Sequence, residues 1–392
     1  MNILLLTQFF SSTKGGGEYV FSLLAKKLAE NGHNIWVITN KIIGEEYTVH
    51  KNIHLVFVKP DLEYKGGIPP NFRDNFRYVI DAITCGRRVI KQEQIDIIHS
   101  NNFSPVLAGS ILSCLSKVSH VTTIHDIFSL CGKNYWKKWG KQNNISKMNV
   151  FLAPLFEKLM IRLKYDCIHT VSETSKYDLV KFGAKKPIYI IHNSIEHYKK
   201  TESIDPIPNQ FVYVGRLVFY KNLEIIIRAI DIARKSDPNI KLIIIGGGPH
   251  RDILEKLVDD LELSSNVEFK GYVDTLEKVQ IISSCSALVF PSLCEGFGLV
   301  ILEAFDQSRP VLVSDIKPMS DIVSHGTNGF VLDPHDENKW SDCFIKIIKN
   351  PHIVSEMGMN GNHVLHTTYN QESMYEKIIE MYEDCMKLKS QK

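Results

Sequence analysis

Short apolar runs rich in isoleucine and valine alternate along this chain with longer segments of helical periodicity, and this alternation constrains the fold more than any other feature. It is typical of βαβ units, in which crossover helices cover a parallel sheet. The pattern runs through both halves of the 392 residues, a length that suits two domains. We therefore predict an α/β protein with two doubly wound, Rossmann-like parallel sheets. The expected strands are 3–6, 35–39, 54–58, 96–99, 121–125, 167–171 and 188–192, then 211–214, 242–245, 267–269, 287–290, 311–314 and 330–332.

A polar segment, 197–210, separates the two halves and holds two prolines. Because it shows neither strand nor helix periodicity, it is the predicted linker, with the domain boundary near Thr201. The predicted domains are residues 1–200 and 201–370. Residues 371–392 form a further predicted helix, which must pack on a larger surface to be stable and is expected to cross back to the first domain.

The composition excludes several classes of protein. Apolar residues make up 44% and charged residues 23%, as in folded globular proteins, so disorder and coiled coil are excluded. A net charge of +2 gives no global reason to bind nucleic acid, and no such partner is expected. No apolar stretch approaches the roughly 20 residues of a membrane span, and the first residues lack the pattern of a secretory signal. We expect a cytoplasmic protein whose eight cysteines are reduced, because no pair has the spacing of a zinc or redox motif.

The most informative segment is 288–306, which predicts a buried strand, a glycine-containing turn and a helix. In open parallel sheets, ligands bind beyond the carboxyl ends of strands, where a helix N-terminus offers free amides to phosphate. Glu295 precedes the helix, and Glu303 lies within it, where a carboxylate can hold ribose hydroxyls. Two isolated glutamates near a helix start would be ordinary solvated carboxylates, but the strand and turn favour a ligand site. The amides are expected from Gly296, Phe297, Gly298 and Leu299.

A second loop, 215–222, follows the first predicted strand of the second half and carries Arg216 and Lys221. A guanidinium and an ammonium in one loop can together neutralise a diphosphate. Taken alone, this spacing also fits an ordinary surface loop in which Asn222 caps the next helix.

Two features of the first half are candidates for the same chemistry. Gly16 and Gly17 follow a predicted strand and open a helix, so their amides can form an anion-binding concavity or simply a flexible turn. His125 closes the predicted strand 121–125, again at a carboxyl end, although a single histidine among 15 is ordinarily structural.

Together these motifs resemble the retaining family-4 glycosyltransferases of GT-B fold, glycosyltransferase group 1 type. Glu295 to Glu303 is similar to the family's E-x7-E element, and Arg216 with Lys221 to its donor-phosphate motif. The resemblance implies two Rossmann-like domains facing a central cleft, with Gly16 and Gly17 across it from the donor pyrophosphate. It also implies that His125 lies at the reaction centre and that the backbone of Val273 contacts the nucleotide base. The proline that often precedes the glycine pair in the family is missing here.

The resemblance implies that a hexose moves from a nucleoside-diphosphate sugar to an acceptor hydroxyl, with retention at the anomeric carbon. A uridine diphosphate donor is expected over guanosine, without cofactor or metal ion. The acceptor is expected to be a glycan or a lipid-linked group in cell-surface polysaccharide, lipopolysaccharide or glycolipid synthesis. Arg216, Lys221 and the helix amides would stabilise charge on the leaving diphosphate, whose phosphate takes the acceptor proton, while Glu295 holds donor-sugar hydroxyls.

Residues 131–165 carry eight lysines and arginines against one acid, Glu157, with aromatic residues between them. This composition suits peripheral contact with an anionic membrane, which an enzyme with a lipid-linked acceptor needs, so the inner face of the cell membrane is an expected location. The alternative is a solvated surface whose aromatic residues lie in the core. The bases are Lys133, Lys137, Lys138, Lys141, Lys147, Lys158, Arg162 and Lys164; the aromatic residues include Tyr135, Trp136, Trp139, Phe151 and Phe156.

Two other functions are compatible with this architecture. A nucleotide-sugar epimerase binds the same donors and transfers nothing, and a non-catalytic partner subunit binds a nucleotide sugar without turnover. The complete set of Arg216, Lys221, Glu295 and Glu303 favours a transferase over both.

Overall fold

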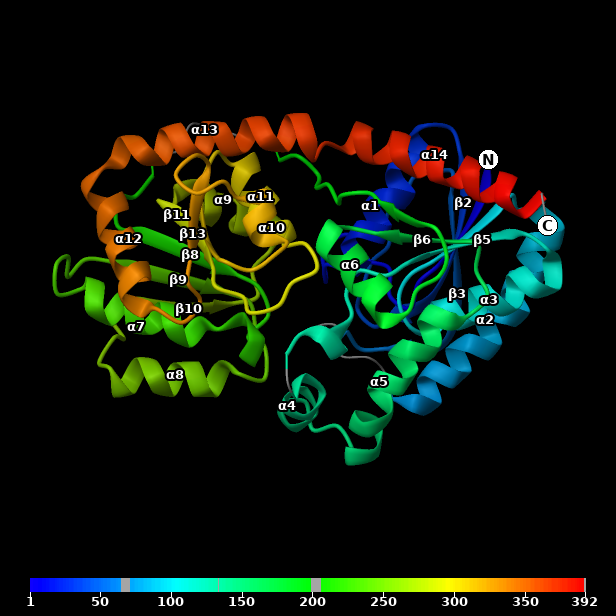
Figure 1. The fold of residues 1–392 in the computed structure, drawn as a ribbon, viewed down its shortest axis with the longest axis horizontal. Helices are drawn as coiled ribbons and strands as arrows, with labels where there is room; N and C mark the ends of the chain where they lie inside the picture. Colours follow the sequence, from blue (N-terminus) through cyan, green and yellow to red (C-terminus); the bar gives the residue numbers. More distant parts are fainter. Residues whose placement is uncertain (65–70, 133, 199–205, 391–392) are drawn as a thin grey trace. The chain divides into compact units, whose positions relative to one another are not determined.

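The structure is a computed structural model that describes residues 1–64, 71–132, 134–198 and 206–390 (Figure 1). Its internal contacts divide the chain into two compact units. Unit 1 comprises Met1–Trp136, Ser146–Ser194 and Gln371–Lys392, and unit 2 comprises Lys137–Ile145 and Ile195–Asn370. The boundary predicted near Thr201 lies outside the described residues, as does Lys133 of the basic stretch.

Unit 1 is built on a seven-stranded parallel sheet of order β3-β2-β1-β4-β5-β6-β7. The order reverses between β1 and β4, which makes this pair the topological switch point of the sheet. The strands are β1 (Asn2–Leu6), β2 (Asn34–Ile42), β3 (Ile53–Leu62), β4 (Ile97–Ser100), β5 (Ser119–Thr123), β6 (Cys167–Thr170) and β7 (Ile188–Ile190). The helices are α1 (Gly17–Glu30), α2 (Phe72–Glu93), α3 (Ser104–Ser116), η1 (Phe128–Leu130), α5 (Lys147–Arg162), α6 (Glu173–Phe182) and α14 (Gln371–Ser390).

Helices cover both faces of this sheet, which explains why its strands read as continuous apolar runs. Successive residues of β1 enter different core clusters, because side chains of a strand point alternately to opposite faces. Ile3 and Leu5 pack with α1 and α14, whereas Leu4 and Leu6 pack with α2 and α3. A third cluster joins α3 to α5 and α6 through Val106.

Unit 2 repeats this design with a six-stranded parallel sheet of order β10-β9-β8-β11-β12-β13, whose switch point lies between β8 and β11. The strands are β8 (Gln210–Val214), β9 (Lys241–Ile245), β10 (Val267–Gly271), β11 (Ala287–Phe290), β12 (Val311–Ser314) and β13 (Gly329–Leu332). The helices are η2 (Phe219–Lys221), α7 (Leu223–Ala233), α8 (Arg251–Asp260), α9 (Thr275–Ser284), α10 (Leu299–Asp306), α11 (Met319–Ile322), α12 (Glu337–Lys349) and α13 (Pro351–Thr368). Most of α4 (Tyr135–Gln142) also belongs to unit 2.

The predicted fold class is confirmed, since both sheets are parallel and doubly wound. Each expected strand is present, with small differences at its ends. The prediction for 121–125 is wrong at its end, because pairing of β5 stops at Thr123. His125 therefore lies in the loop after the strand rather than closing it.

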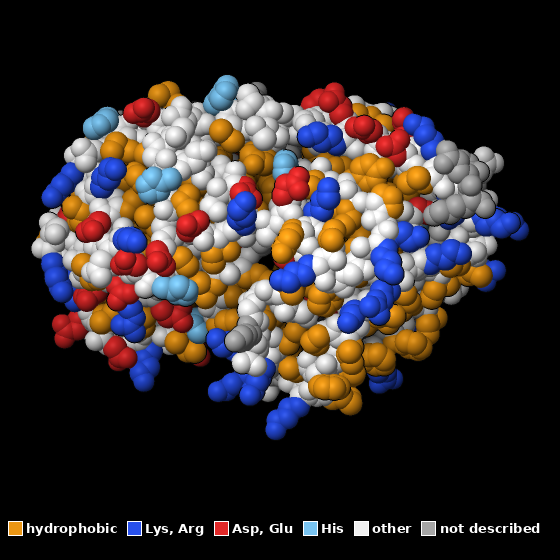
Figure 2. Space-filling model, viewed as in Figure 1, with side chains coloured by type: hydrophobic (Ala, Val, Ile, Leu, Met, Phe, Trp, Pro, Cys, Tyr) orange, Lys and Arg blue, Asp and Glu red, His pale blue; other side chains and the backbone are white. Residues whose placement is uncertain are grey.

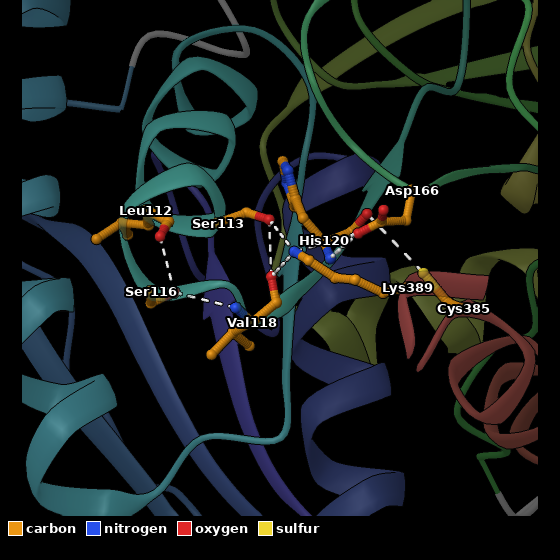
Figure 3. Close-up of polar contacts among 8 residues, drawn as sticks. All are labelled: Leu112, Ser113, Ser116, Val118, His120, Asp166, Cys385 and Lys389. Carbon is orange, nitrogen blue, oxygen red and sulfur yellow. Dashed lines mark hydrogen bonds and ion pairs between the residues drawn. The ribbon is translucent and has the colours of Figure 1, made fainter. Parts of the chain in front are cut away.

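Polar contacts of Lys389 anchor the end of the C-terminal helix α14 on unit 1. Figure 3 shows the Lys389 ammonium donating to Ser113 Oγ at 2.6 Å and to the carbonyl of Val118. The Asp166 carboxylate lies 3.5 Å from the same ammonium and accepts from the backbone N–H of His120. These contacts fix the end of α14 on the segments that flank β5.

Two findings concern the cysteines and membrane spans. Among the described residues, no helix is long and apolar enough to cross a membrane. Six cysteines, namely Cys85, Cys114, Cys167, Cys285, Cys343 and Cys385, are free thiols.

Earlier in α14, the buried Tyr382 hydroxyl shares a 2.7 Å hydrogen bond with Nδ1 of His99 in β4. We predict that Tyr382→Phe lowers the free energy of unfolding by about 1 to 3 kcal/mol, because it leaves a buried imidazole nitrogen unsatisfied. Tyr375→Phe is the matched control, since its 3.1 Å bond to His33 is only partly buried and water can replace it. Chemical denaturation of both variants measures the difference, and equal losses would contradict this account.

Candidate functional site

Two loops at the switch point of unit 2 come together beyond the carboxyl ends of β8 and β11. The first loop, 215–221, carries Arg216 and Lys221, and the second, 291–298, carries Glu295. The backbone N–H of Leu293 donates to the carbonyl of Tyr220 at 2.8 Å, and the Lys221 ammonium donates to the Glu295 carboxylate. The connections that follow β8 and β11 run to opposite faces of the sheet, so the first loops of both lie at the switch point. Open parallel sheets bind their ligands at this position.

The Lys221 ammonium is held in a confined environment. Its side chain is only 12% exposed, and that of Glu295 is 14% exposed. The ammonium lies 4.8 Å from the ring centroid of Phe290 and 5.6 Å from that of Tyr220. Because apolar rings exclude water around this charge, its field on a neighbouring anion is stronger than in bulk solvent.

The N-terminus of α10 lies next to this pair and depends on glycine. Gly298 is the N-cap residue with φ of 93°, and no side chain caps the first amides of this helix. A Cβ at this position would lie 3.1 Å from Ile301 Cδ1 and 3.3 Å from Phe290 Cε1. The left-handed backbone and the close packing both require glycine at position 298. Gly298 is buried, and so are the two residues before it, Gly296 and Phe297. The amides and the helix dipole therefore favour an anion at this point.

The other predicted donor residues lie on neighbouring parts of unit 2. Glu303 is in α10, and its carboxylate accepts from the Lys278 ammonium of α9 at 2.8 Å. Val273 lies in the short segment between β10 and α9. That segment follows Gly271, whose carbonyl accepts from the N–H of Gly246 at 2.7 Å. The loops after β9 and β10 are thus joined by backbone bonding.

Unit 1 has a corresponding arrangement at its own switch point. A Cβ built on Gly17, at the start of α1, would lie 3.5 Å from Nε2 of His125 and 3.7 Å from Nδ2 of Asn101. Gly16 is the N-cap residue of α1, with no side-chain cap. The structure therefore brings Gly16, Gly17 and His125 together, beyond the carboxyl ends of β1, β4 and β5.

The His125 imidazole is suited to hydrogen bonding rather than to carrying a charge. His125 as a whole residue is partly buried, and its Nε2 is enclosed and has no hydrogen-bond partner among the described residues. Burial, and to a smaller extent the neighbouring His169, lower the pKa of His125 to about 3. The ring is therefore neutral at physiological pH, and its enclosed Nε2 keeps an unused hydrogen-bonding capacity among the described residues.

Sequence reasoning missed three residues that support these sites. Gln142 of α4 accepts from the N–H of Phe219 at 3.3 Å and donates to Nδ1 of His250 at 2.8 Å, which braces the loop 215–221. Asn101 follows β4 at the unit 1 switch point, and Lys278 orients Glu303. The position of Asn101 after a strand was a usable signal, whereas Gln142 and Lys278 carry no local motif.

No group of three or more His, Cys, Asp or Glu side chains that could hold a metal ion occurs in the described part of the chain. The polar groups gathered in unit 2 are instead two cations, a helix N-terminus and two carboxylates. This set is suited to a phosphorylated ligand that also carries hydroxyl groups.

Comparison with known proteins identifies the class. The family described as "Glycosyltransferase Family 4" matches residues 14–198, and "Glycosyl transferases group 1" matches residues 194–364. An N-acetyl-alpha-D-glucosaminyl L-malate synthase of Bacillus anthracis is 23% identical over 390 residues, which cover 95% of each chain. The two family matches meet near the junction of the two units and together span most of the chain.

Solved structures agree on the fold. Sucrose-phosphate synthase from Thermosynechococcus elongatus superposes with a TM-score of 0.81 at 19% identity, covering 98% of each chain. The HepE protein of Anabaena, in a complex with UDP and glucose, superposes with a TM-score of 0.73 at 17% identity, covering 98% of this chain and all of that one. Fold and sequence therefore define a glycosyltransferase. The chain belongs to the group 1, family 4 glycosyltransferases.

The substitution Gly17→Ala tests the unit 1 site without disturbing the fold. The nearest atoms to the added methyl group lie at 3.5 to 3.7 Å, which is ordinary van der Waals contact, and the φ angle of Gly17 is not positive. We predict an unchanged melting temperature together with a loss of transfer rate of roughly tenfold or more, since a methyl group beside His125 Nε2 displaces a ligand from its optimal position. Gln92→Ala is the control, because Gln92 is exposed on α2 and lies outside this site. Equal rates for Gly17→Ala and the wild type would contradict this role.

Proposed function

We propose that this protein transfers a hexose from a nucleoside-diphosphate sugar, in particular a UDP-sugar, to an acceptor hydroxyl with retention at the anomeric carbon and without a metal ion. The observation that carries the proposal is the meeting of the loops 215–221 and 291–298 around Lys221 and Glu295, beside the open N-terminus of α10. Family membership supports the reaction class, and this geometry supports the placement of the diphosphate.

The diphosphate would lie between the cations of the first loop and the amides of the second. As the bond to the sugar breaks, negative charge grows on the leaving phosphate. Arg216, Lys221 and the amides of Gly298 and Leu299 would stabilise that charge. Lys221 and the helix amides are already held in place, so they would do so with little reorganisation. Such a set of fixed positive groups can serve the purpose that a metal ion serves in other transferases.

In this proposal, Lys221 exchanges partners when the donor binds. In the unliganded chain its ammonium is paired with Glu295. A diphosphate carries more negative charge than one carboxylate, so it would attract the ammonium and leave Glu295 able to accept hydrogen bonds from donor-sugar hydroxyls. Glu303 would hold the ribose hydroxyls, with Lys278 keeping its carboxylate oriented, and the backbone of Val273 would lie against the base.

The residues of unit 1 would act at the reacting groups. The neutral imidazole of His125 can exchange a hydrogen bond through Nε2 with a sugar hydroxyl, and Gly16 and Gly17 leave room and free amides beside it. Retention is proposed to follow from attack on the face that the diphosphate leaves. The bond from the acceptor oxygen to the anomeric carbon forms as the bond to the phosphate oxygen breaks, and that phosphate takes the acceptor proton.

We also propose a glycan or lipid-linked acceptor, in polysaccharide, lipopolysaccharide or glycolipid synthesis, and peripheral contact of residues 131–165 with the inner face of the cell membrane. Seven bases of this stretch are described and all are exposed, whereas its one acid, Glu157, is buried. Some of the aromatic residues lie in the core and others are available for membrane contact: Tyr135 and Trp139 are buried, whereas Phe151 is 74% exposed. An exposed basic surface of this kind attracts anionic headgroups.

The role of Lys221 gives a direct kinetic prediction. Lys221→Met should reduce kcat/KM by roughly 100-fold or more, because it removes a fixed positive charge from the leaving diphosphate. Lys270→Met is the matched control, since Lys270 also pairs with a glutamate, Glu268, at 2.9 Å but on the exposed side of β10. Initial rates with a UDP-sugar measure the effect, and thermal unfolding verifies the fold of each variant. A loss below threefold would contradict the assigned role.

The stereochemistry of the product tests the reaction course. We expect nuclear magnetic resonance of the first product formed to show the same anomeric configuration as the donor, with no covalent intermediate. An inverted product would exclude the proposed front-face course. A glycosyl group trapped on Glu295 would replace it with double displacement. Conversion of the donor sugar without transfer would favour an epimerase, and donor binding without any turnover a non-catalytic partner subunit.

A further inference from the structure

Nine large apolar side chains are exposed on two helices of unit 1, with exposed fractions from 36% to 75%. On α2 they are spaced four residues apart, and Phe72 and Phe76 stack with ring centroids 6.4 Å apart. On α5 they recur every three or four residues, so each helix presents one apolar stripe. The residues are Phe72, Phe76 and Ile80 on α2, and Met148, Phe151, Leu152, Leu155, Phe156 and Leu159 on α5. We call these nine residues the α2–α5 apolar face.

The two stripes point away from the sheet, because the opposite faces of both helices are already used in the core. Tyr78, Val79 and Ala82 of α2 are buried against the sheet and α3. Met160 and Ile161 of α5 are buried in the cluster that includes Val106 of α3. Figure 2 shows hydrophobic side chains, with Lys and Arg among them, gathered where Figure 1 draws α2 and α5. The side chains of the α2–α5 apolar face are therefore not part of these core clusters.

Helix α3 links the two stripes into one side of unit 1. Its packing with α2 is close, since a Cβ on Gly86 of α2 would lie 2.5 Å from Leu112 of α3. Its other end reaches α5 through Val106. Both helices thus pack on the same layer, and their outer stripes are available to the same partner.

The charges around the α2–α5 apolar face are predominantly positive. Helix α5 exposes Lys147, Lys158 and Arg162 and exposes no acid. Its one acid, Glu157, is turned inward, where its carboxylate accepts from the N–H of Phe128 at 2.9 Å and the indole N–H of Trp136 at 3.3 Å. Its buried position raises the pKa of Glu157. Helix α2 also exposes Arg73, Arg77, Arg87, Arg88 and Lys91, while its Asp74, Asp81 and Glu93 are partly buried.

A basic pocket borders the apolar stripe of α2. It has a volume of about 650 Å³ and is lined by Lys59, Arg73 and Arg77 together with Phe76 and Ile80. Asp61 and Asp74 also line it; Asp61 pairs with Lys59 at 3.1 Å, and Asp81 with Arg77 at 3.1 Å. Cations beside exposed phenylalanines match the chemistry of a phospholipid, in which a phosphate adjoins an acyl chain.

We propose that the α2–α5 apolar face inserts into the surface of an anionic phospholipid membrane, with phosphate groups bound by the surrounding lysines and arginines. This inference rests on the peripheral contact proposed for residues 131–165 and makes it specific, because it adds α2 and assigns the binding energy to inserted apolar side chains as well as to charge. Charge complementarity decides the partner. A basic, apolar surface without exposed acids on α5 is repelled by a second copy of itself and attracted by anionic lipid.

Vesicle sedimentation tests the proposal with two double variants, Phe72→Ser with Phe76→Ser on α2 and Phe151→Ser with Leu155→Ser on α5. The vesicles contain phosphatidylcholine alone or mixed with phosphatidylglycerol. We expect the wild type to bind the mixed vesicles, and each double variant to lose roughly tenfold or more in partition coefficient, because each removes two inserted side chains. Ile253→Ser with Met359→Ser is the matched control, since these residues of unit 2 are 55% and 60% exposed, and its binding should equal that of the wild type.

Three outcomes would overturn the proposal. The first is failure of the wild type to bind the mixed vesicles. The second is binding that is sensitive to salt but unaffected by both double variants, which would leave charge contact of residues 131–165 and exclude insertion. The third is a dimer in light scattering that the same variants dissociate, which would assign the α2–α5 apolar face to a second copy. All variants should bind UDP as the wild type does, so that a fault in the donor site is recognised separately.

Discussion

Both units depend on one constraint of parallel sheets, the reversal of strand order at the switch point. Right-handed crossovers carry the chain to opposite faces of the sheet on the two sides of this point, so the segments that follow the two central strands border a crevice beyond the strand ends. In unit 2 the space is bounded by the loops after β8 and β11, which carry Lys221 and Glu295. In unit 1 it is bounded by the start of α1 and the segments after β4 and β5, where Gly17 and His125 meet. The strand order of each sheet therefore determines where its site lies, and the side chains determine what the site binds.

The side chains add a prearranged positive field to the unit 2 site. Lys221 is enclosed by aromatic rings and paired with Glu295, so it occupies a defined position before a ligand arrives. Gly298 permits the sharp turn that aims the first amides of α10 into the same space. Further support comes from a distance along the chain, because Gln142 binds both the loop 215–221 and His250, which in turn donates to Glu224 at 2.5 Å. A site held in this way loses little energy to rearrangement when charge develops on a ligand.

The fold and much of the donor site could be predicted from the sequence, since both depend on local patterns. Buried parallel strands are recognised as apolar runs, and the glycine turn before Glu303 identifies a strand-to-helix ligand site. Residues that act through tertiary contact could not be found in this way. Gln142 lies in a helix that follows strands of the first half of the chain yet contacts a loop of unit 2. The apolar stripe of α2 resembles any amphipathic helix until the structure shows which side is already covered.

The most direct test of the central claim, a UDP-binding donor site in unit 2, is calorimetric titration of the wild type and Glu303→Gln with UDP, GDP and ADP in the presence of a chelator. The account predicts that UDP binds in preference to the other nucleotides. It also predicts that Glu303→Gln weakens this binding by roughly tenfold, because a charged acceptor for the ribose hydroxyls is lost. The matched variant Glu268→Gln, which alters an exposed Glu–Lys pair, should bind UDP as the wild type does. Binding that requires a divalent metal ion, or that is unchanged in Glu303→Gln, would contradict the account.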